Sequence, residues 1–94
     1  MFNINLESGL YYLTLSPTTC KSLGQIWNVI PKFKRNSLIK KGESIFTFET
    51  TTGLRNIQSP MAGKVADWAE TICEDMPERI NDETVLLVLT GVNP

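Results

Sequence analysis

The sequence contains no histidine among its 94 residues. Histidine is the usual general base near neutral pH, the usual partner of a serine or cysteine nucleophile, and a common zinc ligand. The two cysteines, Cys20 and Cys73, form no CxxC metal or redox motif, and a lone cysteine without a base is usually a small core residue. Glu74 and Asp75 would raise the pKa of the Cys73 thiol, the wrong direction for a nucleophile. An enzyme is therefore not expected.

The chain also lacks long apolar runs and any marked excess of charge. No stretch approaches the length that crosses a bilayer, and residues 1–7 have no basic residue before an apolar run, so no secretory signal is expected. Nine basic against ten acidic residues give a net charge of −1, which favours neither nucleic acid nor an anionic membrane as a partner. The basic residues between 32 and 41 are expected to form a solvated loop. These features favour a cytoplasmic protein with reduced thiols.

No metal site is expected either. An acidic stretch lies near the C-terminal end, but a calcium loop needs ligands at regular alternating positions and a central glycine. The stretch has neither, so it predicts a solvated face; its members are Glu74, Asp75, Glu78, Asp82 and Glu83.

Length and composition suit a single domain spanning residues 1–94, with a hydrophobic fraction of 41% that is ordinary for a globular protein. Short apolar segments between turn residues predict strands. The expected fold class is mainly β, a sandwich or barrel with one or two short helices. The last expected strand is apolar almost throughout, which predicts burial on both faces. The expected strands are residues 10–15, 25–30, 44–49, 54–58, 64–68 and 84–89.

Capping residues predict where the helices lie. Ser16 is a good N-cap and Pro17 suits the first helical position, so a helix of about two turns is expected to begin there and to end at Gly24. A second helix is expected to begin with Asp75 as its cap and Glu78 three positions on. Separately, Ile72, Met76 and Ile80 recur at four-residue spacing, which could bury one helical face.

Three blocks of sequence, in order, resemble the H protein of the glycine cleavage system. Residues 13–31 contain a strand, a short helix ending in Leu-Gly-Gln and a strand closing on Ile-Pro. Residues 39–43 and 59–65 form the Lys-Gly-Glu and Ser-Pro-Met-Ala-Gly-Lys-Val turns that are typical of biotinyl- and lipoyl-carrier domains. Residues 75–81, Asp-Met-Pro-Glu-Arg-Ile-Asn, are similar to a segment particular to H proteins.

The resemblance covers roughly residues 10–89 and implies a fold. That fold is the barrel-sandwich hybrid of the lipoyl- and biotinyl-carrier domains, a flattened barrel of two small sheets. The resemblance also implies that Gly42 and Gly63 lie in tight turns, where they shape the backbone and carry no chemistry.

The resemblance fails at the expected hairpin tip, residues 50–53. In the family, a carrier lysine follows a glutamate by three residues; here the glutamate is Glu49, and Thr52 occupies the lipoyl-lysine position. Lipoylation forms an amide with an ε-amine, which threonine lacks, and residues 42–63 contain no lysine. The Arg55 guanidinium stays protonated and cannot substitute. Lipoate is therefore not an expected cofactor.

The leading hypothesis is a non-lipoylated binding module, a pseudo-carrier. Its expected partners are proteins that handle true H proteins: the lipoate-attaching enzymes or the aminomethyl-transfer and decarboxylase components. The expected contact residues lie at the hairpin tip: Glu49, Thr51, Thr52 and Gly53. One alternative is a degenerate carrier of the glycine cleavage system. The other is a structural subunit that self-associates through this fold, which exposed aromatic residues would support: Tyr11, Trp27 and Trp68.

Overall fold

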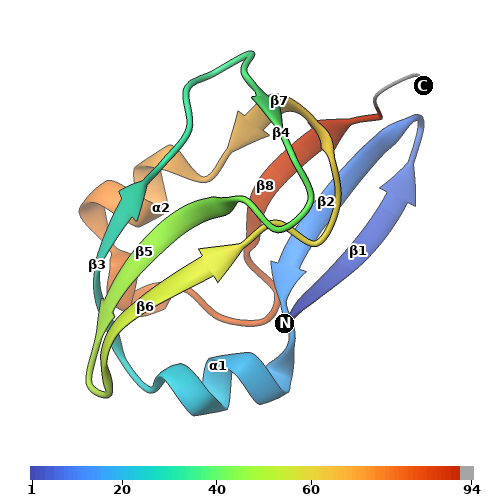
Figure 1. Cartoon of the computed structure of the whole chain (residues 1–94). Coiled ribbons are helices and arrows are strands. Elements are labelled where there is room, and N and C mark those ends of the chain that lie inside the picture. Colours follow the sequence, from blue (N-terminus) through green and yellow to red (C-terminus); the bar gives the residue numbers. More distant parts are fainter. Residues whose placement is uncertain (92–94) are drawn as a thin grey trace.

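The computed structural model describes residues 1–91, which form two antiparallel sheets packed face to face (Figure 1). The strands of the larger sheet lie in the order β1 (Phe2–Glu7), β2 (Leu10–Leu15), β8 (Val85–Thr90), β7 (Gly63–Trp68) and β4 (Leu38–Ile39). Those of the smaller sheet are β3 (Ile26–Pro31), β5 (Ser44–Thr50) and β6 (Gly53–Gln58). The helices are α1 (Pro17–Leu23) and α2 (Glu70–Asp75), followed by the 3₁₀ turn η1 (Pro77–Arg79). The expected mainly β architecture is confirmed.

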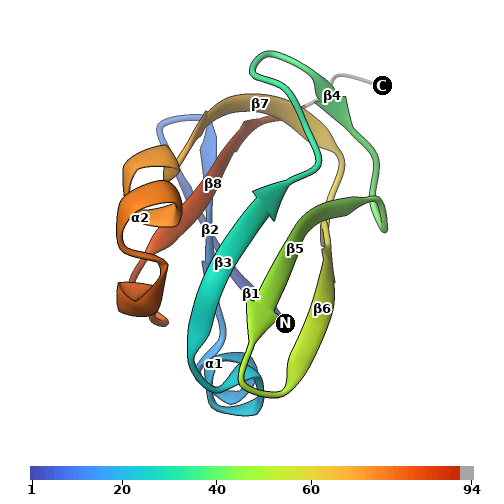
Figure 2. The same cartoon turned by 90° about the vertical axis from the view of Figure 1, so that its left-hand side faces the viewer.

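The core lies between the central strands of the two sheets, β5 and β8 (Figure 2). Phe46 and Phe48 on β5 are fully buried, and the Phe46 ring meets Phe33 edge-on at 5.2 Å between centroids. Phe33 in turn meets the ring of Trp68 edge-on at 5.5 Å. The predicted burial of the last strand on both faces is confirmed by four consecutive buried residues: Leu86, Leu87, Val88 and Leu89.

The strand β1 was not predicted from the sequence. Its residues pair with β2, from Phe2 opposite Leu15 to Glu7 opposite Leu10. Ser8 and Gly9 form the connection with φ of 52° and 80°, the positive values that a tight type I′ hairpin requires at both positions. The signals that could have predicted it are the apolar–polar alternation of residues 2–7 and the Ser-Gly pair after them.

The first helix matches its prediction. The Ser16 Oγ accepts a hydrogen bond from the Thr19 N–H at 3.2 Å, and Pro17 is the first helical residue. Gly24 follows the last turn with a φ of 70°, and its N–H donates to the Cys20 carbonyl.

The predicted start of the second helix is wrong. Asp75 is the last residue of α2 rather than a cap, and only the single turn η1 follows. The reason is Pro77, because a proline disfavours helical backbone in the residue before it, and Met76 has an extended φ of −142°. Ile72 packs against the core from α2 and Ile80 from the extended residue after η1, so the two do not share one helix.

Two smaller expectations also need correction. The expected loop of residues 32–41 contains the short strand β4, which pairs with β7. Gly42 lies in a turn with a φ of 86°, as expected, but Gly63 is the first residue of β7. What requires glycine at position 63 is close packing, because a Cβ there would lie 2.8 Å from the Thr90 carbonyl oxygen and 3.0 Å from the Leu89 Cβ.

Gly63→Ala is therefore expected to lower the free energy of unfolding by about 1–3 kcal/mol, the usual cost of overpacking. Urea denaturation followed by tryptophan fluorescence measures it. Gly91→Ala is the matched control, since its Cβ would meet only Tyr11 at an ordinary 3.5 Å. Equal stabilities for the two variants would contradict this explanation of Gly63.

Candidate functional site

The hairpin tip between β5 and β6 holds the contact residues expected from the sequence. The turn itself consists of Thr51 and Thr52, both exposed, between Thr50 and Gly53, which pair across the hairpin. The buried Thr50 hydroxyl organises the turn, because its Oγ1 accepts from the Thr52 N–H at 3.1 Å and donates to the Gly53 carbonyl at 3.0 Å. Gly53 has a φ of 109°, a conformation that favours glycine.

The tip is bonded to the segment that follows α1. The Thr52 hydroxyl donates to the Leu23 carbonyl at 3.3 Å. Thr51 and Gln25 exchange two bonds: the Thr51 N–H donates to the Gln25 carbonyl at 3.0 Å, and the Gln25 N–H donates to the Thr51 Oγ1 at 3.2 Å. Gly24 leaves room for this contact, since a Cβ there would collide with the Thr51 hydroxyl. The hydroxyls expected to meet a partner, those of Thr51 and Thr52, are thus engaged in hydrogen bonds within the chain.

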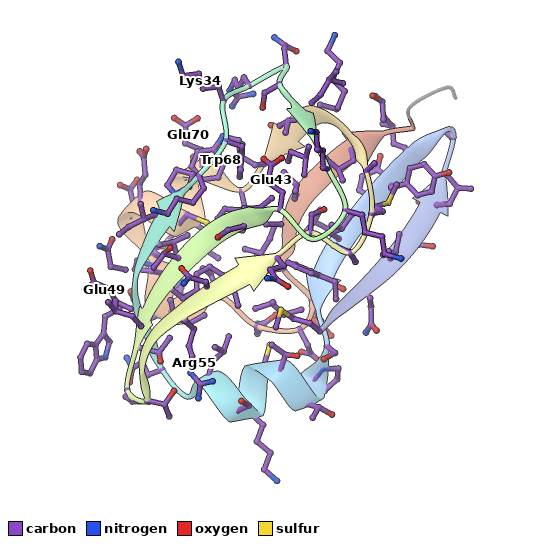
Figure 3. All side chains as sticks on the ribbon, in the orientation of Figure 1. Lys34, Glu43, Glu49, Arg55, Trp68 and Glu70 are labelled. Carbon is purple, nitrogen blue, oxygen red and sulfur yellow. The ribbon has the colours of Figure 1, made fainter. Side chains whose placement is uncertain are left out.

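Glu49 lies on the outer face of the smaller sheet, next to the tip (Figure 3). In the register of the strands it is flanked by Asn28 on β3 and Leu54 on β6. Its side chain is half-buried and forms no ion pair within residues 1–91. Leu54 beside it is 72% exposed.

Trp27 belongs to the same surface because of a β-bulge. Ile26 pairs with Thr50 and Asn28 pairs with Glu49, so Trp27 is an additional residue without a partner across the strands. Bulges redirect side chains, and the Trp27 side chain is 61% exposed. Trp27, Asn28, Glu49 and Leu54 are called the outer tip face below. Asn28 and Leu54 were not predicted as site residues, and no local signal marks them, since the register of three strands brings them together.

The chain is similar in sequence to a protein of the glycine cleavage system. Over 79 residues it is 33% identical to the probable glycine cleavage system H protein of Aeropyrum pernix, an alignment that covers 83% of this chain. The alignment covers 53% of that protein, so the chain spans about half the length of its curated relative. No family model matches the sequence.

The fold resembles the crystal structure of a glycine cleavage system H protein from Mycobacterium marinum. The TM-score is 0.76 at 15% sequence identity, covering 95% of this chain and 76% of that one. The chain is H-protein-like. The barrel-sandwich hybrid expected from the resemblance is therefore confirmed as its fold.

A cavity of about 220 Å³ lies between β6 and α1. Arg55 lines it from β6, and in Figure 3 its side chain lies toward α1, away from Glu49. Leu23, which accepts the hydrogen bond from Thr52, lines it as well, together with three hydroxyl residues of α1: Thr18, Thr19 and Ser22.

The other groups considered in the sequence lie elsewhere. The basic side chains of residues 32–41 are exposed, and Arg35 forms ion pairs with Asp67 at 3.4 Å and Glu70 at 3.2 Å, so these charges form a solvated face as expected. Two apolar side chains of the same segment, Phe33 and Ile39, pack into the core instead. Within residues 1–91, no three or more acidic or cysteine side chains gather in a way that could hold a metal ion. The helices of this part of the chain are all too short or too polar to span a membrane.

The surroundings of both cysteines raise the pKa of the thiol. Burial raises the pKa of the Cys73 thiol to about 12, and the negative charge of Glu74 acts in the same direction. Burial, followed by the charge of Asp82, raises the pKa of the half-buried Cys20.

A neutral alkylating agent such as iodoacetamide is therefore expected to react with both thiols more slowly than with a free model thiol at pH 8. For Cys73 the expected slowing is about a thousandfold, because a thiol with a pKa of about 12 holds roughly a thousandth of the thiolate that an ordinary cysteine holds at pH 8. Peptide mapping by mass spectrometry measures the two rates separately. A Cys20 rate above that of the model thiol would revive the idea of a reactive cysteine.

Proposed function

We propose that this chain is a member of the H-protein family that acts as a binding module without lipoate, a pseudo-carrier. One observation carries the proposal: the tip of an H-protein-like fold holds Thr52 where the carrier lysine is expected, and the Thr52 hydroxyl is bonded to the Leu23 carbonyl. An amide to lipoate needs an amine, and the turn has none. We accordingly assign the chain neither an enzymatic activity nor the role of a degenerate carrier, and we propose the cytoplasm as its location.

The surface proposed for docking combines the outer tip face with the exposed turn of Thr51, Thr52 and Gly53. Trp27 supplies a large, rigid apolar group of the kind that dominates binding energy at protein interfaces. Glu49 supplies a carboxylate, half-buried between polar and apolar neighbours, that a lysine or arginine of a partner can meet. The proposed partners are the lipoate-attaching enzymes or the aminomethyl-transfer and decarboxylase components of glycine cleavage.

The double variant Trp27→Ala with Glu49→Ala is expected to bind such a partner at least about tenfold more weakly, since each loss at the centre of an interface typically exceeds 1 kcal/mol. Biolayer interferometry with the immobilised chain and each purified enzyme measures the affinity.

The control is Glu83→Ala with Val85→Ala, which removes one exposed acidic and one exposed apolar group outside the smaller sheet and is expected to leave affinity unchanged. If the wild type binds none of these enzymes, the proposed function is wrong. If it binds and the tip variant binds equally well, the function stands but the docking surface is elsewhere.

A further inference from the structure

The N-terminal strand β1 is a free edge of the larger sheet. It pairs with β2 on one side only, and in Figure 1 it is the outermost strand of the hairpin that points away from the smaller sheet. A free edge presents unpaired backbone N–H and C=O groups, and proteins usually protect such edges with lysine, proline, bulges or very short strands.

Each of the other three edges is very short, bulged, or carries a basic residue or a proline, whereas β1 has none of these features and its single charge, Glu7, lies at its hairpin end. The strand β4 has two residues, β3 has the bulge at Trp27 and ends in Pro31, and β6 carries Arg55. The sequence of β1, FNINLE, contains neither a basic residue nor a proline, and its pairing with β2 is regular throughout.

Alternate residues of β1 form backbone hydrogen bonds with β2, and this alternation determines which backbone groups of β1 are free. The Ser16 N–H donates to the Met1 carbonyl at 2.8 Å, and Met1 lies opposite Ser16 in the continued register. Because bonded pairs alternate in an antiparallel ladder, the odd residues of β1 face β2. The N–H and C=O groups of the even residues point away from the sheet: those of Phe2, Ile4 and Leu6.

The same three residues place apolar side chains on the core-facing side of the sheet, but the smaller sheet covers them only in part. Ile4 lies opposite the fully buried Leu13, yet Ile4 itself is 44% exposed. Leu6, nearer the hairpin end, is 57% exposed. Free backbone groups and uncovered apolar side chains thus coincide along a single strand.

We propose that β1 pairs with β1 of a second copy of this chain, antiparallel and centred on Ile4. This register places Ile4 opposite Ile4 and Phe2 opposite Leu6 of the second copy. This register pairs all three residues that have free backbone groups. Each of the three residue pairs forms two backbone hydrogen bonds, so six hydrogen bonds join the two copies. A shift by two residues in either direction loses one of the three pairs. The two larger sheets then form one continuous sheet through an isologous, two-fold interface.

The same register keeps like side chains together. Phe2, Ile4 and Leu6 of both copies lie on one face, where each copy covers apolar surface that the other leaves exposed. On the opposite face, Asn3 of one copy faces Asn5 of the other. This dimer does not depend on the proposed docking function, since β1 belongs to the larger sheet and the outer tip face to the smaller one.

Sedimentation velocity on the 94-residue chain tests the dimer. A species of about 21 kDa, twice the 10.6 kDa of the monomer, is expected to grow with concentration. Ile4→Lys places two positive charges directly opposite each other at the two-fold axis and is expected to abolish the dimer. Leu54→Lys is the matched control, an exposed leucine on an edge strand of the other sheet, and is expected to leave the dimer intact. A wild type that stays monomeric up to about 1 mM, or equal effects of the two substitutions, would overturn the proposal.

Disulfide cross-linking in a Cys20→Ser background tests the register. Asn3 and Asn5 face each other as a non-bonded pair, about 4.5 Å apart at Cα, which is within disulfide range. Mixing Asn3→Cys with Asn5→Cys is expected to give a cross-linked dimer, whereas each variant alone gives little. Cross-linking of Asn3→Cys alone or of Asn5→Cys alone would indicate a register shifted by two residues and would contradict the pairing centred on Ile4.

Discussion

Thr52→Lys is expected to turn this chain into an acceptor of lipoate. The substitution supplies an ε-amine at the second residue of the turn, the position that corresponds to the carrier lysine in the resemblance. Thr52 is exposed, so a lysine side chain at this position can extend into solvent. The substitution also removes the 3.3 Å hydrogen bond that joins the hairpin to the Leu23 carbonyl. Intact mass spectrometry after incubation with a purified lipoate-attaching enzyme and its substrates measures the gain, from no modification in the wild type to a major modified fraction.

Position-matched variants make this result specific. Thr51→Lys adds the same amine one residue earlier, where the loss of the Thr51 hydroxyl bond with Gln25 also loosens the tip, and little modification is expected. If the enzyme contacts the outer tip face, adding Glu49→Ala to Thr52→Lys is expected to reduce the lipoylated fraction. A folded Thr52→Lys variant that remains unmodified would rule out the lipoate-attaching enzymes as partners of this surface and restrict the pseudo-carrier proposal to the glycine-cleavage components.

The strands that could be predicted from the sequence are those with local signals. Alternating or continuous apolar residues between Gly, Pro and Ser turns located β2, β5 and β8 closely, and Ser16 and Pro17 located α1. The Asp75 prediction failed because the capping pattern competed with Pro77, whose effect on the preceding residue was the stronger.

The arrangement of the candidate site could not be predicted in the same way. Sequence reasoning found Glu49 and the turn through the resemblance, but the bond from Thr52 to Leu23 joins residues 29 positions apart. The exposure of Trp27 depends on a bulge that exists only in the pairing of β3 with β5. A tryptophan in an apolar strand is as compatible with the core as with the surface, so only the three-dimensional register separates the two. Tyr11 and Trp68, by contrast, are half-buried and pack against the core.

The largest loss of stability is expected from Phe46→Ala. Phe46 is fully buried in the central strand of the smaller sheet and contacts the rings of Phe33, Phe48 and Trp68. Removing a buried aromatic ring typically costs about 3–5 kcal/mol, a large share of the 5–15 kcal/mol by which native proteins are stable. Urea denaturation measures the change. Phe33→Ala removes a partly buried ring of the same aromatic cluster and is expected to lower the free energy of unfolding by less. A larger loss for Phe33→Ala would mean that Phe33, in the segment between β3 and β4, contributes more to the stability of the cluster than Phe46 does.

Because β5 carries both Phe46 in the core and Glu49 at the tip, Phe46→Ala and Glu49→Ala can weaken docking for different reasons. At a urea concentration near the unfolding midpoint of the Phe46 variant, Phe46→Ala lowers the folded fraction, and the apparent affinity falls in proportion to that fraction. Glu49→Ala removes a contact from a chain that stays folded. Adding an osmolyte such as sucrose, which favours the folded state, is therefore expected to restore binding by the Phe46 variant and not by the Glu49 variant. Restoration of both would show that Glu49 supports the fold rather than the interface.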